Sequence, residues 1–299
     1  MTILEALQFA NEELKTREGD DTPMLDAELL LAMAMNVPKS WLFTHFNEIV
    51  SKEAEGRFDL LLKRRMAHEP VAYLLGSKDF YGRTFEVNRH VLIPRPATET
   101  LVEEALLVAR ETEPDALLFA DIGTGSGAIA ITLAAESGIP AIATDLSDEA
   151  LRLASANART HGVADQVEFR QGDLLAPLLA IFEALRRESP GMPIRRLVLA
   201  ANLPYLTDEQ VETAQPDVRL YEPHLALAAG PDGLDAYWHL LRELKKYRPV
   251  FPQRITALLE IDPSQRDQML ALIRHDWPEA DIRVAKDLQG NDRVVVAEL

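Results

Sequence analysis

The fold of this chain is decided by the stretch Leu118-Phe119-Ala120-Asp121-Ile122-Gly123-Thr124-Gly125-Ser126-Gly127. The apolar run at 117–120 predicts a buried parallel strand, because strands covered on both faces are continuously hydrophobic. Three glycines follow in a loop, and the apolar residues 128–135 are typical of a helix. Glycine permits positive φ and has no Cβ to block a close approach to the backbone. Strand, loop and helix therefore predict a place where a ligand lies against the main chain.

The spacing of the glycines narrows the choice of ligand. They fall as G-x-G-x-G, which is neither the G-x-G-x-x-G dinucleotide fingerprint nor a G-x-x-x-x-G-K-[ST] phosphate loop. The carboxylate of Asp121 would repel a pyrophosphate and suits an ammonium group. Asp145 ends the next expected strand, 141–144, where an acid can accept both ribose hydroxyls. A Rossmann-like turn that serves another nucleotide, or none, remains the alternative.

These two features together resemble the cofactor site of class I S-adenosylmethionine methyltransferases. S-adenosylmethionine carries both an ammonium group and a ribose diol. The resemblance implies a Rossmann-like, doubly wound α/β sheet with S-adenosylmethionine as the cofactor.

Composition limits the remaining possibilities. The 299 residues are 47% hydrophobic and 26% charged, and they include no cysteine, so disulfides and thiolate sites are excluded. We see no signal peptide and no apolar run near ~20 residues, so we expect a cytoplasmic protein without membrane contact. The net charge of −17 opposes binding to a phosphate backbone and favours a protein or small-molecule substrate.

Periodicity divides the chain into three parts. It predicts a small helical domain at 1–75, a hairpin and a proline-rich connector at 76–97, and an α/β domain at 98–299. The resemblance implies that the third part is the methyltransferase domain, and we expect the first to recognise the substrate. We expect breaks at Gly19-Asp20-Asp21 and at Pro190-Gly191-x-Pro193, and helix caps at Thr22, Ser51 and Thr98. In the third part we expect strands at 117–120, 141–144, 167–170, 196–200, 255–261, 281–285 and 293–298, and helices at 127–136, 148–161, 174–188, 233–247 and 264–275.

Asn202-Leu203-Pro204-Tyr205 follows the fourth strand, at the edge where ligands bind in open α/β sheets. This set suits a planar amide or exocyclic amine as methyl acceptor. The Asn202 side-chain oxygen and a neighbouring backbone carbonyl, most simply that of Leu203, can accept both N–H hydrogens and aim the nitrogen. Pro204 would stiffen the loop, and Tyr205 would pack on the planar group. Positioning and desolvation would then supply most of the rate.

This motif resembles the N-P-P-Y signature of methyltransferases that act on planar nitrogens. Further stretches resemble the PrmC/HemK family, whose members are release-factor glutamine methyltransferases. They are Glu-Pro-Val-Ala-Tyr-Leu-Leu-Gly (69–76), Phe80-Tyr81-Gly82, Val91-Leu92-Ile93-Pro94-Arg95-Pro96, Tyr221-Glu222-Pro223, Gly230-Pro231-Asp232-Gly233-Leu234 and Asp287-Leu288-x-Gly-x-Asp292-Arg293.

The resemblance implies methyl transfer to the side-chain amide of the Gln in the Gly-Gly-Gln motif of peptide chain release factors. It implies a protein partner, no direct nucleic-acid contact and a monomer. Arg95 and Glu99 match the family's connector. The implied catalytic residues are Asn202, Pro204 and Tyr205, which with Leu203 also bind the substrate. The implied cofactor-binding residues are Asp121, Gly123, Thr124, Gly125, Ser126, Gly127, Asp145, Leu146, Asp173, Leu174 and Asn202.

The chain departs from the family at three places. Leu203 stands where the family has Pro, Ala97 replaces the first Glu of an R-P-E-T-E run, and 174–195 is longer than usual. N-L-P-Y also occurs in ribosomal RNA adenine dimethyltransferases, so an rRNA adenine N6-methyltransferase is one alternative. A catalytically silent homologue that only binds the cofactor is the other.

Several other residues favour structural roles. The seven histidines show no metal-ligand spacing, so we expect no metal site. Trp41, Trp238 and Trp277 are expected in the core. The basic run Lys63-Arg64-Arg65 is expected on a solvated helix face, and Arg293 is expected to pair with a carboxylate.

Overall fold

The computed structural model describes residues 1–17, 22–188 and 194–299. They form two compact units, one of Met1–Lys78 with Thr213–Glu222 and one of Asp79–Glu212 with Pro223–Leu299. The two breaks expected at Gly19–Asp21 and around Pro190–Pro193 lie outside the described residues. No described helix has the length and apolar character needed to cross a membrane.

The first unit is helical, as predicted. Its apolar side chains form a core of their own, built mainly from three long helices. Ser51 caps one of them by accepting from the backbone N–H of Ala54 at 3.2 Å, as expected, whereas Thr22 makes no side-chain cap bond. Two of its short helices, α5 and α11, were not predicted. The helices are α1 (Ile3–Lys15), α2 (Pro23–Met35), α3 (Lys39–Leu42), α4 (Lys52–Met66), α5 (Val71–Leu75) and α11 (Pro216–Tyr221).

Arg65 corrects the expectation that the whole basic run is solvated. Lys63 and Arg64 are exposed, but Arg65 is only 6% exposed. Its guanidinium donates to Asp26 at 2.6 Å and to Asp217 at 2.5 Å. Position 65 lies three and four residues after the core residues 62 and 61, so it shares their face of α4.

The second unit begins with the predicted hairpin. Its strands are β1 (Ser77–Phe80) and β2 (Arg83–Glu86), and the unit boundary falls within β1. Tyr81 and Gly82 turn the chain with φ of 50° and 70°. Two consecutive positive φ values are typical of a tight hairpin turn.

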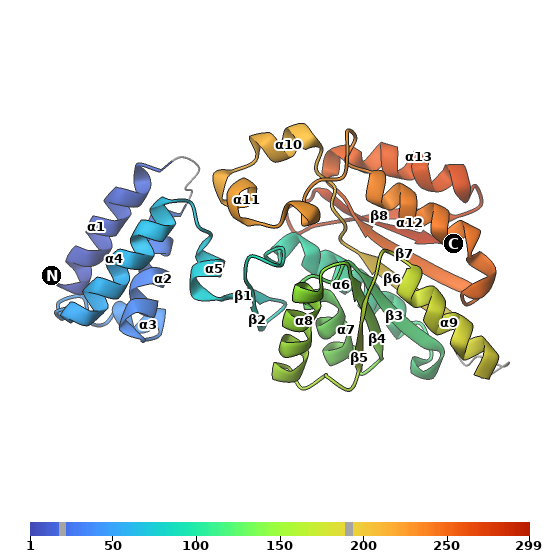
Figure 1. Ribbon diagram of the computed structural model, residues 1–299, viewed down its shortest axis with the longest axis horizontal. Helices are drawn as coiled ribbons and strands as arrows, with labels where there is room; N and C mark the ends of the chain where they lie inside the picture. The colour runs from blue at the N-terminus through green and yellow to red at the C-terminus, as the bar shows by residue number, and fades with distance from the viewer. Residues whose placement is uncertain (18–21, 189–193) are drawn as a thin grey trace. The chain divides into compact units, whose positions relative to one another are not determined.

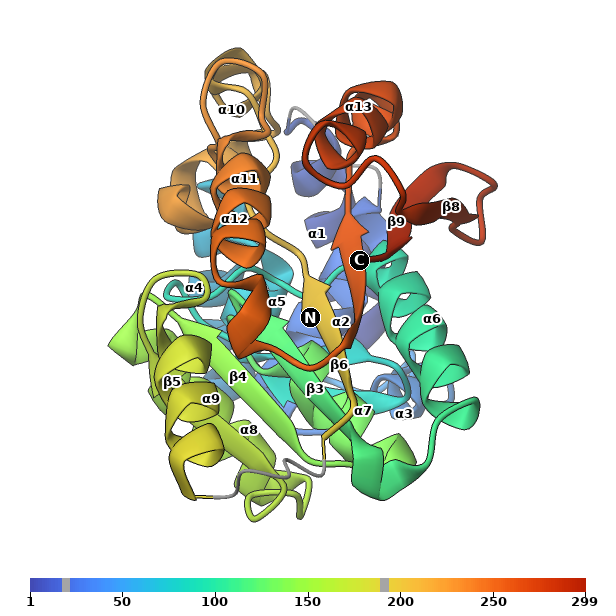
Figure 2. The same ribbon diagram turned by 90° about the vertical axis from the view of Figure 1, so that its right-hand side faces the viewer.

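A seven-stranded sheet in the order β5-β4-β3-β6-β7-β9-β8 organises the rest of this unit. β9 runs antiparallel to both neighbours, and the other pairs are parallel. This is the doubly wound sheet predicted from the sequence (Figures 1 and 2). The elements are α6 (Glu99–Arg110), β3 (Leu117–Ile122), α7 (Ala128–Ser137), β4 (Ala141–Asp145), α8 (Asp148–Thr160), β5 (Val167–Gln171), α9 (Ala176–Glu188), β6 (Arg196–Ala201), α10 (Asp208–Thr213), α12 (Asp235–Lys246), β7 (Arg254–Glu260), α13 (Arg266–Asp276), β8 (Asp281–Lys286) and β9 (Asp292–Glu298), with short 3-10 turns that include η1 (Pro96–Thr98).

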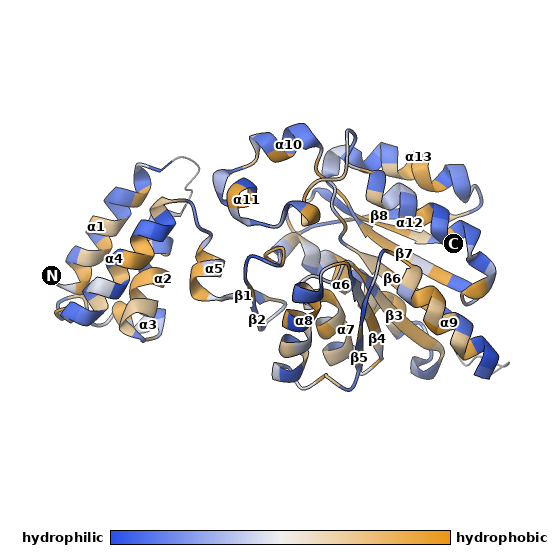
Figure 3. Cartoon of the chain, in the orientation of Figure 1, coloured by the Kyte–Doolittle hydropathy of each residue, from blue (hydrophilic) through white to orange (hydrophobic). Residues whose placement is uncertain are grey.

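Helices cover both faces of the sheet. Leu117 and Phe119 of β3 pack with α6, α7 and α8, while Leu118, Ala120 and Ile122 pack with α9, α12 and α13. Successive strand residues point to opposite faces, so a strand between two helical layers must be apolar throughout. The hydropathy colouring shows this, with central strands orange and the outer surfaces of helices blue (Figure 3).

Two local expectations were wrong. Thr98 makes no side-chain cap bond at α6, and its hydroxyl instead contacts Asn202. Trp238 is 40% exposed and lies against the guanidinium of Arg242, 4.5 Å from the ring centroid. Trp41 and Trp277 are partly buried against the cores, as expected.

Candidate active site

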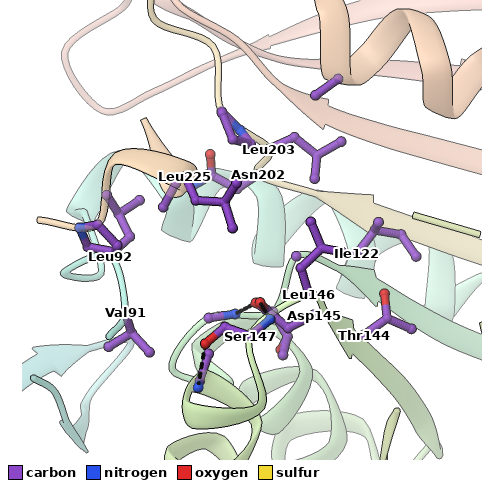
Figure 4. Close-up of a pocket in the computed structure, with 18 of the residues that line it drawn as sticks. Val91, Leu92, Ile122, Thr144, Asp145, Leu146, Ser147, Asn202, Leu203 and Leu225 are labelled. Carbon is purple, nitrogen blue, oxygen red and sulfur yellow. Dashed lines mark hydrogen bonds between the residues drawn. The ribbon is translucent and has the colours of Figure 1, made fainter. Parts of the chain in front are cut away.

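A cavity of about 630 Å³ opens at the carboxyl ends of β3, β4 and β6, wholly within the second unit. Figure 4 shows Asp145 and Ser147 on one side of it and Asn202 and Leu203 on another. Most residues predicted from the sequence line it: Gly123, Thr124, Gly125, Ser126, Asp145, Leu146, Asp173, Leu174, Asn202, Leu203 and Pro204. Asp121, Gly127 and Tyr205 are not among the lining residues.

The glycine loop takes the backbone shape that its sequence requires. Gly123, Gly125 and Gly127 have φ of 74°, 55° and 82°. A Cβ on Gly127 would lie 2.7 Å from Cδ1 of Ile131, so this glycine is needed for packing against the following helix. A Cβ on Gly123 would lie 3.0 Å from Cδ2 of Leu203, so this glycine lets the two loops of the pocket approach each other.

Asp121 is fully buried and holds the glycine loop closed. Its Oδ2 accepts from the Thr124 hydroxyl at 2.6 Å and from the Ala130 backbone N–H at 3.1 Å. Burial raises its pKa to about 6, although these two hydrogen bonds act in the opposite direction. Contact with a cofactor ammonium stays a prediction, and the geometry gives this carboxylate a clear structural role.

Asp145 stands at the end of β4, and both of its carboxylate oxygens accept backbone hydrogens. Oδ2 accepts from Gly125 N–H and Oδ1 from Ser147 N–H, each at 2.9 Å. Burial raises its pKa, while these bonds favour the charged form. A carboxylate has about four acceptor sites, so capacity remains for ribose hydroxyls. The exposed Leu146 and the pair Asp173-Leu174 complete this side of the cavity.

Asn202 directly follows β6 and presents an unsatisfied acceptor. Its Nδ2 donates to the Thr98 hydroxyl at 3.1 Å. Its Oδ1 is buried and has no hydrogen-bond partner among the described residues. A buried polar atom without a partner is unusual, and a site for a ligand donor explains it.

Leu203 occupies the place of a family proline and is held in another way. Its backbone N–H, which a proline would lack, donates to the Tyr237 hydroxyl at 3.2 Å. That hydroxyl also lies 2.5 Å from the carbonyl oxygen of Glu260. Tyr237 therefore ties the loop after β6 to the end of β7.

Tyr205 lies deeper than the sequence suggested. Its side chain packs against the core that α12 and α13 share with the sheet. Burial, assisted by the nearby Glu260, raises its pKa to about 12, so the phenol stays neutral. Its backbone carbonyl accepts from the Gln265 amide at 2.7 Å. Stacking of Tyr205 on a substrate stays a prediction.

Sequence reasoning missed several residues around the site. Thr98 was interpreted only as a helix cap, although it stands in the run that matches the family's connector, and Tyr237 was interpreted only as part of the helix at 233–247. Glu260 follows the strand-end rule that located Asp145 and Asn202 and could have been found by it. The segment 223–230 also lines the cavity. Arg293 pairs with Asp287 at 3.3 Å, in line with its predicted carboxylate contact.

Comparison with family models places two known domains on the chain. The PrmC N-terminal domain model matches residues 5–76. The methyltransferase domain model matches residues 119–184.

Solved structures show the same methyltransferase fold at low identity. The hMettl16 catalytic domain in complex with MAT2A 3'UTR hairpin 6 has a TM-score of 0.54 at 12% identity, over 80% of this chain and 91% of that one. Human methyltransferase 10 domain containing protein has a TM-score of 0.50 at 15% identity, over 73% and 88%. At these identities the likeness concerns the fold alone.

Curated relatives match along the whole chain. The release factor glutamine methyltransferase of Cereibacter sphaeroides is 38% identical and covers 100% of this chain and 99% of its own length. Those of Bacillus anthracis and Bacillus subtilis are 33% and 35% identical, covering 100% and 99% of this chain and 100% and 97% of their own. With this match and with the cavity, glycine loop and Asn202 in place, the chain belongs to the release factor glutamine methyltransferase family.

Proposed function

We propose that this enzyme methylates the side-chain amide nitrogen of the Gln in the Gly-Gly-Gln motif of peptide chain release factors. The observation that carries the proposal is the buried, unpartnered Oδ1 of Asn202 at the edge of the cavity. This oxygen can accept a hydrogen bond from an N–H group of a bound substrate, and an amide –NH2 has such a group. The full-length relatives named for this reaction support the same substrate.

S-adenosylmethionine is the cofactor of this methyltransferase, and it supplies a methyl group bonded to a positively charged sulfur. The residues present fit it. The cavity of about 630 Å³ combines a positive-φ glycine loop with a strand-end carboxylate that retains acceptor capacity. Gly123 and Gly125 would let the cofactor approach the backbone, Asp145 would accept from its ribose, and Asp173-Leu174 would border its adenine.

Asn202 and the carbonyl of Leu203 would each accept one hydrogen of the substrate –NH2. An amide nitrogen is a weak nucleophile because its lone pair is delocalised. Holding both hydrogens orients that lone pair and stabilises the positive charge that develops on nitrogen. Transfer of the methyl group leaves a cationic amide, which is strongly acidic and loses its extra proton to water afterwards, so no base is needed before the transfer. Tyr205, kept neutral by its raised pKa, cannot serve as one near neutral pH.

The test is transfer of labelled methyl from S-adenosylmethionine to a purified release factor. We expect label on the Gly-Gly-Gln protein and none on a version whose motif Gln is changed to Ala. Asn202→Ala should abolish transfer, while Thr132→Val should not, since Thr132 is a buried residue of α7 that does not line the cavity. Equal labelling of both release factors would refute the glutamine assignment.

The rRNA and silent-homologue alternatives are less well supported. The net charge of −17 opposes RNA binding, and the relatives covering the whole chain are named for release factors. Asn202 is present, and the Leu203 N–H has a partner, so the motif is intact. Ribosomal RNA included as a second acceptor in the assay should remain unlabelled.

We further propose that the enzyme acts as a monomer in the cytoplasm and makes no direct contact with nucleic acid. The proposed substrate, a translation factor, supports this location. The acidic net charge supports recognition of a protein surface without RNA.

A further inference from the structure

We propose that Glu260 is a positioning residue which, through the hydroxyl of Thr98, fixes which end of the Asn202 amide faces the substrate. The inference deepens the proposed function, because the substrate –NH2 gives the exposed oxygen its purpose. Asn202 and Thr98 lie in the N-L-P-Y and R-P-A-T-E stretches of the sequence, whereas Glu260 lies in none of the motifs that identified the site.

Sheet register brings the three residues together. β6 and β7 are parallel neighbours, with Ala201 opposite Leu259, so Asn202, directly after β6, lies beside Glu260, the last residue of β7. η1 delivers Thr98 to the same edge, where its Oγ1 accepts from Asn202 Nδ2 at 3.1 Å.

The carboxylate of Glu260 is buried and incompletely satisfied. The residue is 1% exposed. The Thr98 hydroxyl faces it and lowers its pKa, but neither carboxylate oxygen reaches normal hydrogen-bond geometry with a described donor. Contacts of this kind are often long without substrate and tighten when the reacting complex forms.

The hydrogen-bonding capacities of Glu260, Thr98 and Asn202 determine which end of the Asn202 amide contacts Thr98. A hydroxyl has one hydrogen to donate, and an amide presents a donor at one end and an acceptor at the other. Thr98 alone could therefore bind either end of Asn202. An ionised carboxylate only accepts, so it takes the hydroxyl hydrogen and leaves Thr98 as an acceptor. Thr98 must then face Nδ2, and Oδ1 is left toward the substrate.

Without an ionised Glu260, the side-chain amide of Asn202 can rotate so that its oxygen and nitrogen exchange places. Thr98 would donate to Oδ1, and the Asn202 –NH2 would face the substrate –NH2, so two donors would oppose each other. Protonating Glu260 has the same effect, because a carboxylic acid can donate to Thr98.

Burial and the neighbouring charged groups determine the pH at which Glu260 becomes protonated. Burial raises the pKa of Glu260 to about 7, while the Thr98 hydroxyl and two guanidinium groups act in the opposite direction. The phenols of Tyr205 and Tyr237 stay neutral because burial raises their pKa values. The ionisable groups facing this region are Arg95, Arg293, Tyr205, Tyr237 and Asp262. We call the chain of contacts from Glu260 through Thr98 to Asn202 the relay. The relay should therefore stop orienting the Asn202 amide as pH falls through about 7.

The first test needs no methyl transfer. In the ¹⁵N-labelled full-length protein, the Asn202 side-chain amide signal is assigned by its loss in Asn202→Ala. We expect this signal to shift with a midpoint near pH 7 in the wild type. The shift should be absent in Glu260→Gln and Thr98→Val and retained in Thr98→Ser and in the control Thr132→Val. If the Asn202 side-chain amide signal of the wild type does not shift between pH 6 and 8, the proposed relay is wrong.

The second test is kinetic. Glu260→Gln and Thr98→Val should each lower kcat about 10–100-fold, the range for a hydrogen bond to a charged group, with unchanged cofactor affinity. The wild-type fall in kcat below pH 7 should disappear in Glu260→Gln. The double variant should be no slower than Thr98→Val alone, because the two residues act in series. Multiplied losses in the double variant would contradict the relay.

The two tests separate the two proposals. A wild type that leaves the release factor unlabelled defeats the proposed function, while the amide signal still decides the relay. A wild type that labels the release factor with no pH-dependent amide signal keeps the function and defeats the relay.

Discussion

Leu203 shows how a single substitution in a motif can be absorbed by its surroundings. A proline there would fix φ and have no N–H to satisfy. Leucine adds a donor, and the structure supplies the Tyr237 hydroxyl at 3.2 Å as its partner. The substitution that left the substrate open at the sequence level is therefore matched by a second residue, Tyr237 of α12.

This pairing gives a prediction for Tyr237→Phe. The change leaves the buried Leu203 N–H without its partner and should lower the free energy of unfolding by about 1–3 kcal/mol, the usual cost of such a loss. In a Leu203→Pro background the cost should be smaller, because proline has no N–H to leave unpaired. Urea unfolding of the four proteins measures the difference. Equal costs in both backgrounds would show that the hydrogen bond contributes nothing.

Glu260 gives a pH prediction of opposite sign to that of an ordinary ion pair. Its pKa is raised from 4.5 to about 7 by burial, so the folded state binds its proton more tightly than the unfolded chain. Its contribution to stability is complete below about pH 4.5 and is lost as pH rises to about 7. At about 1.4 kcal/mol per pKa unit, the loss is at most about 3.5 kcal/mol.

Glu260→Gln should therefore be more stable than the wild type at pH 8, by up to about 3.5 kcal/mol, and no more stable at pH 4. Denaturation with urea at the two pH values tests this. The same variant should be the slower enzyme, which is the expected trade when a buried charge is kept for function. A variant that is less stable at pH 8 would show that the ionised carboxylate is well satisfied in the folded protein.

At the level of elements, the sequence predicted what periodicity and strand ends control. The sequence located all seven strands of the sheet, and continuous apolar runs marked β3, β4 and β6 because these strands are buried on both faces. The strand-end rule brought Asp145 and Asn202 to one cavity. Sequence patterns did not predict the short helices α5, α10 and α11, which have only five or six residues and no clear hydrophobic period. Tertiary contacts determine where these helices form. Thr98 was misread because Asn202, far away in sequence, uses its hydroxyl.

The helix α11 shows such a tertiary contact. Asp217 accepts from Arg17 at 2.9 Å and from Arg65 at 2.5 Å, and both arginine side chains are almost fully buried. Arg65 also pairs with Asp26 at 2.6 Å. This cluster joins α11 to α1, α2 and α4 within the first unit, although about 150 residues separate Arg65 from Asp217 in sequence.

Asp217→Ala should release α11 and destabilise the first unit. Removing one partner of a buried charge cluster costs about 3–5 kcal/mol, and the retained Asp26 should keep the loss near about 3 kcal/mol. Hydrogen exchange of α11 and α4 amides should accelerate, while that of the sheet should not. Asp208→Ala, at an exposed position of α10, is the matched control and should change neither. Unchanged exchange in α11 would mean that its apolar contacts alone hold it.

At the scale of the whole molecule, the two units have separate cores. The helical core comprises residues between Ile3 and Leu74, and both cores of the sheet lie between Phe80 and Ala297. Every residue lining the cavity belongs to the second unit. A ligand in that cavity should therefore stabilise one core directly and leave the other largely unaffected.

Hydrogen exchange with and without S-adenosylhomocysteine, the reaction product, tests this division. At a concentration 100 times its Kd, a ligand that binds only the folded form adds about 2.7 kcal/mol to stability. Amides of β3, β4 and β6 that exchange by unfolding of the second unit should slow about 100-fold, while those of α1, α2 and α4 should keep their rates. The Asn202→Ala variant, with the ligand at 100 times the Kd of that variant, serves as a control, because the glycine loop and Asp145 remain and the ligand should still slow exchange in the sheet when methyl transfer is lost. Equal slowing in the helices would show that the two cores unfold as one cooperative body, and that the helical unit responds to the state of the cavity without lining it.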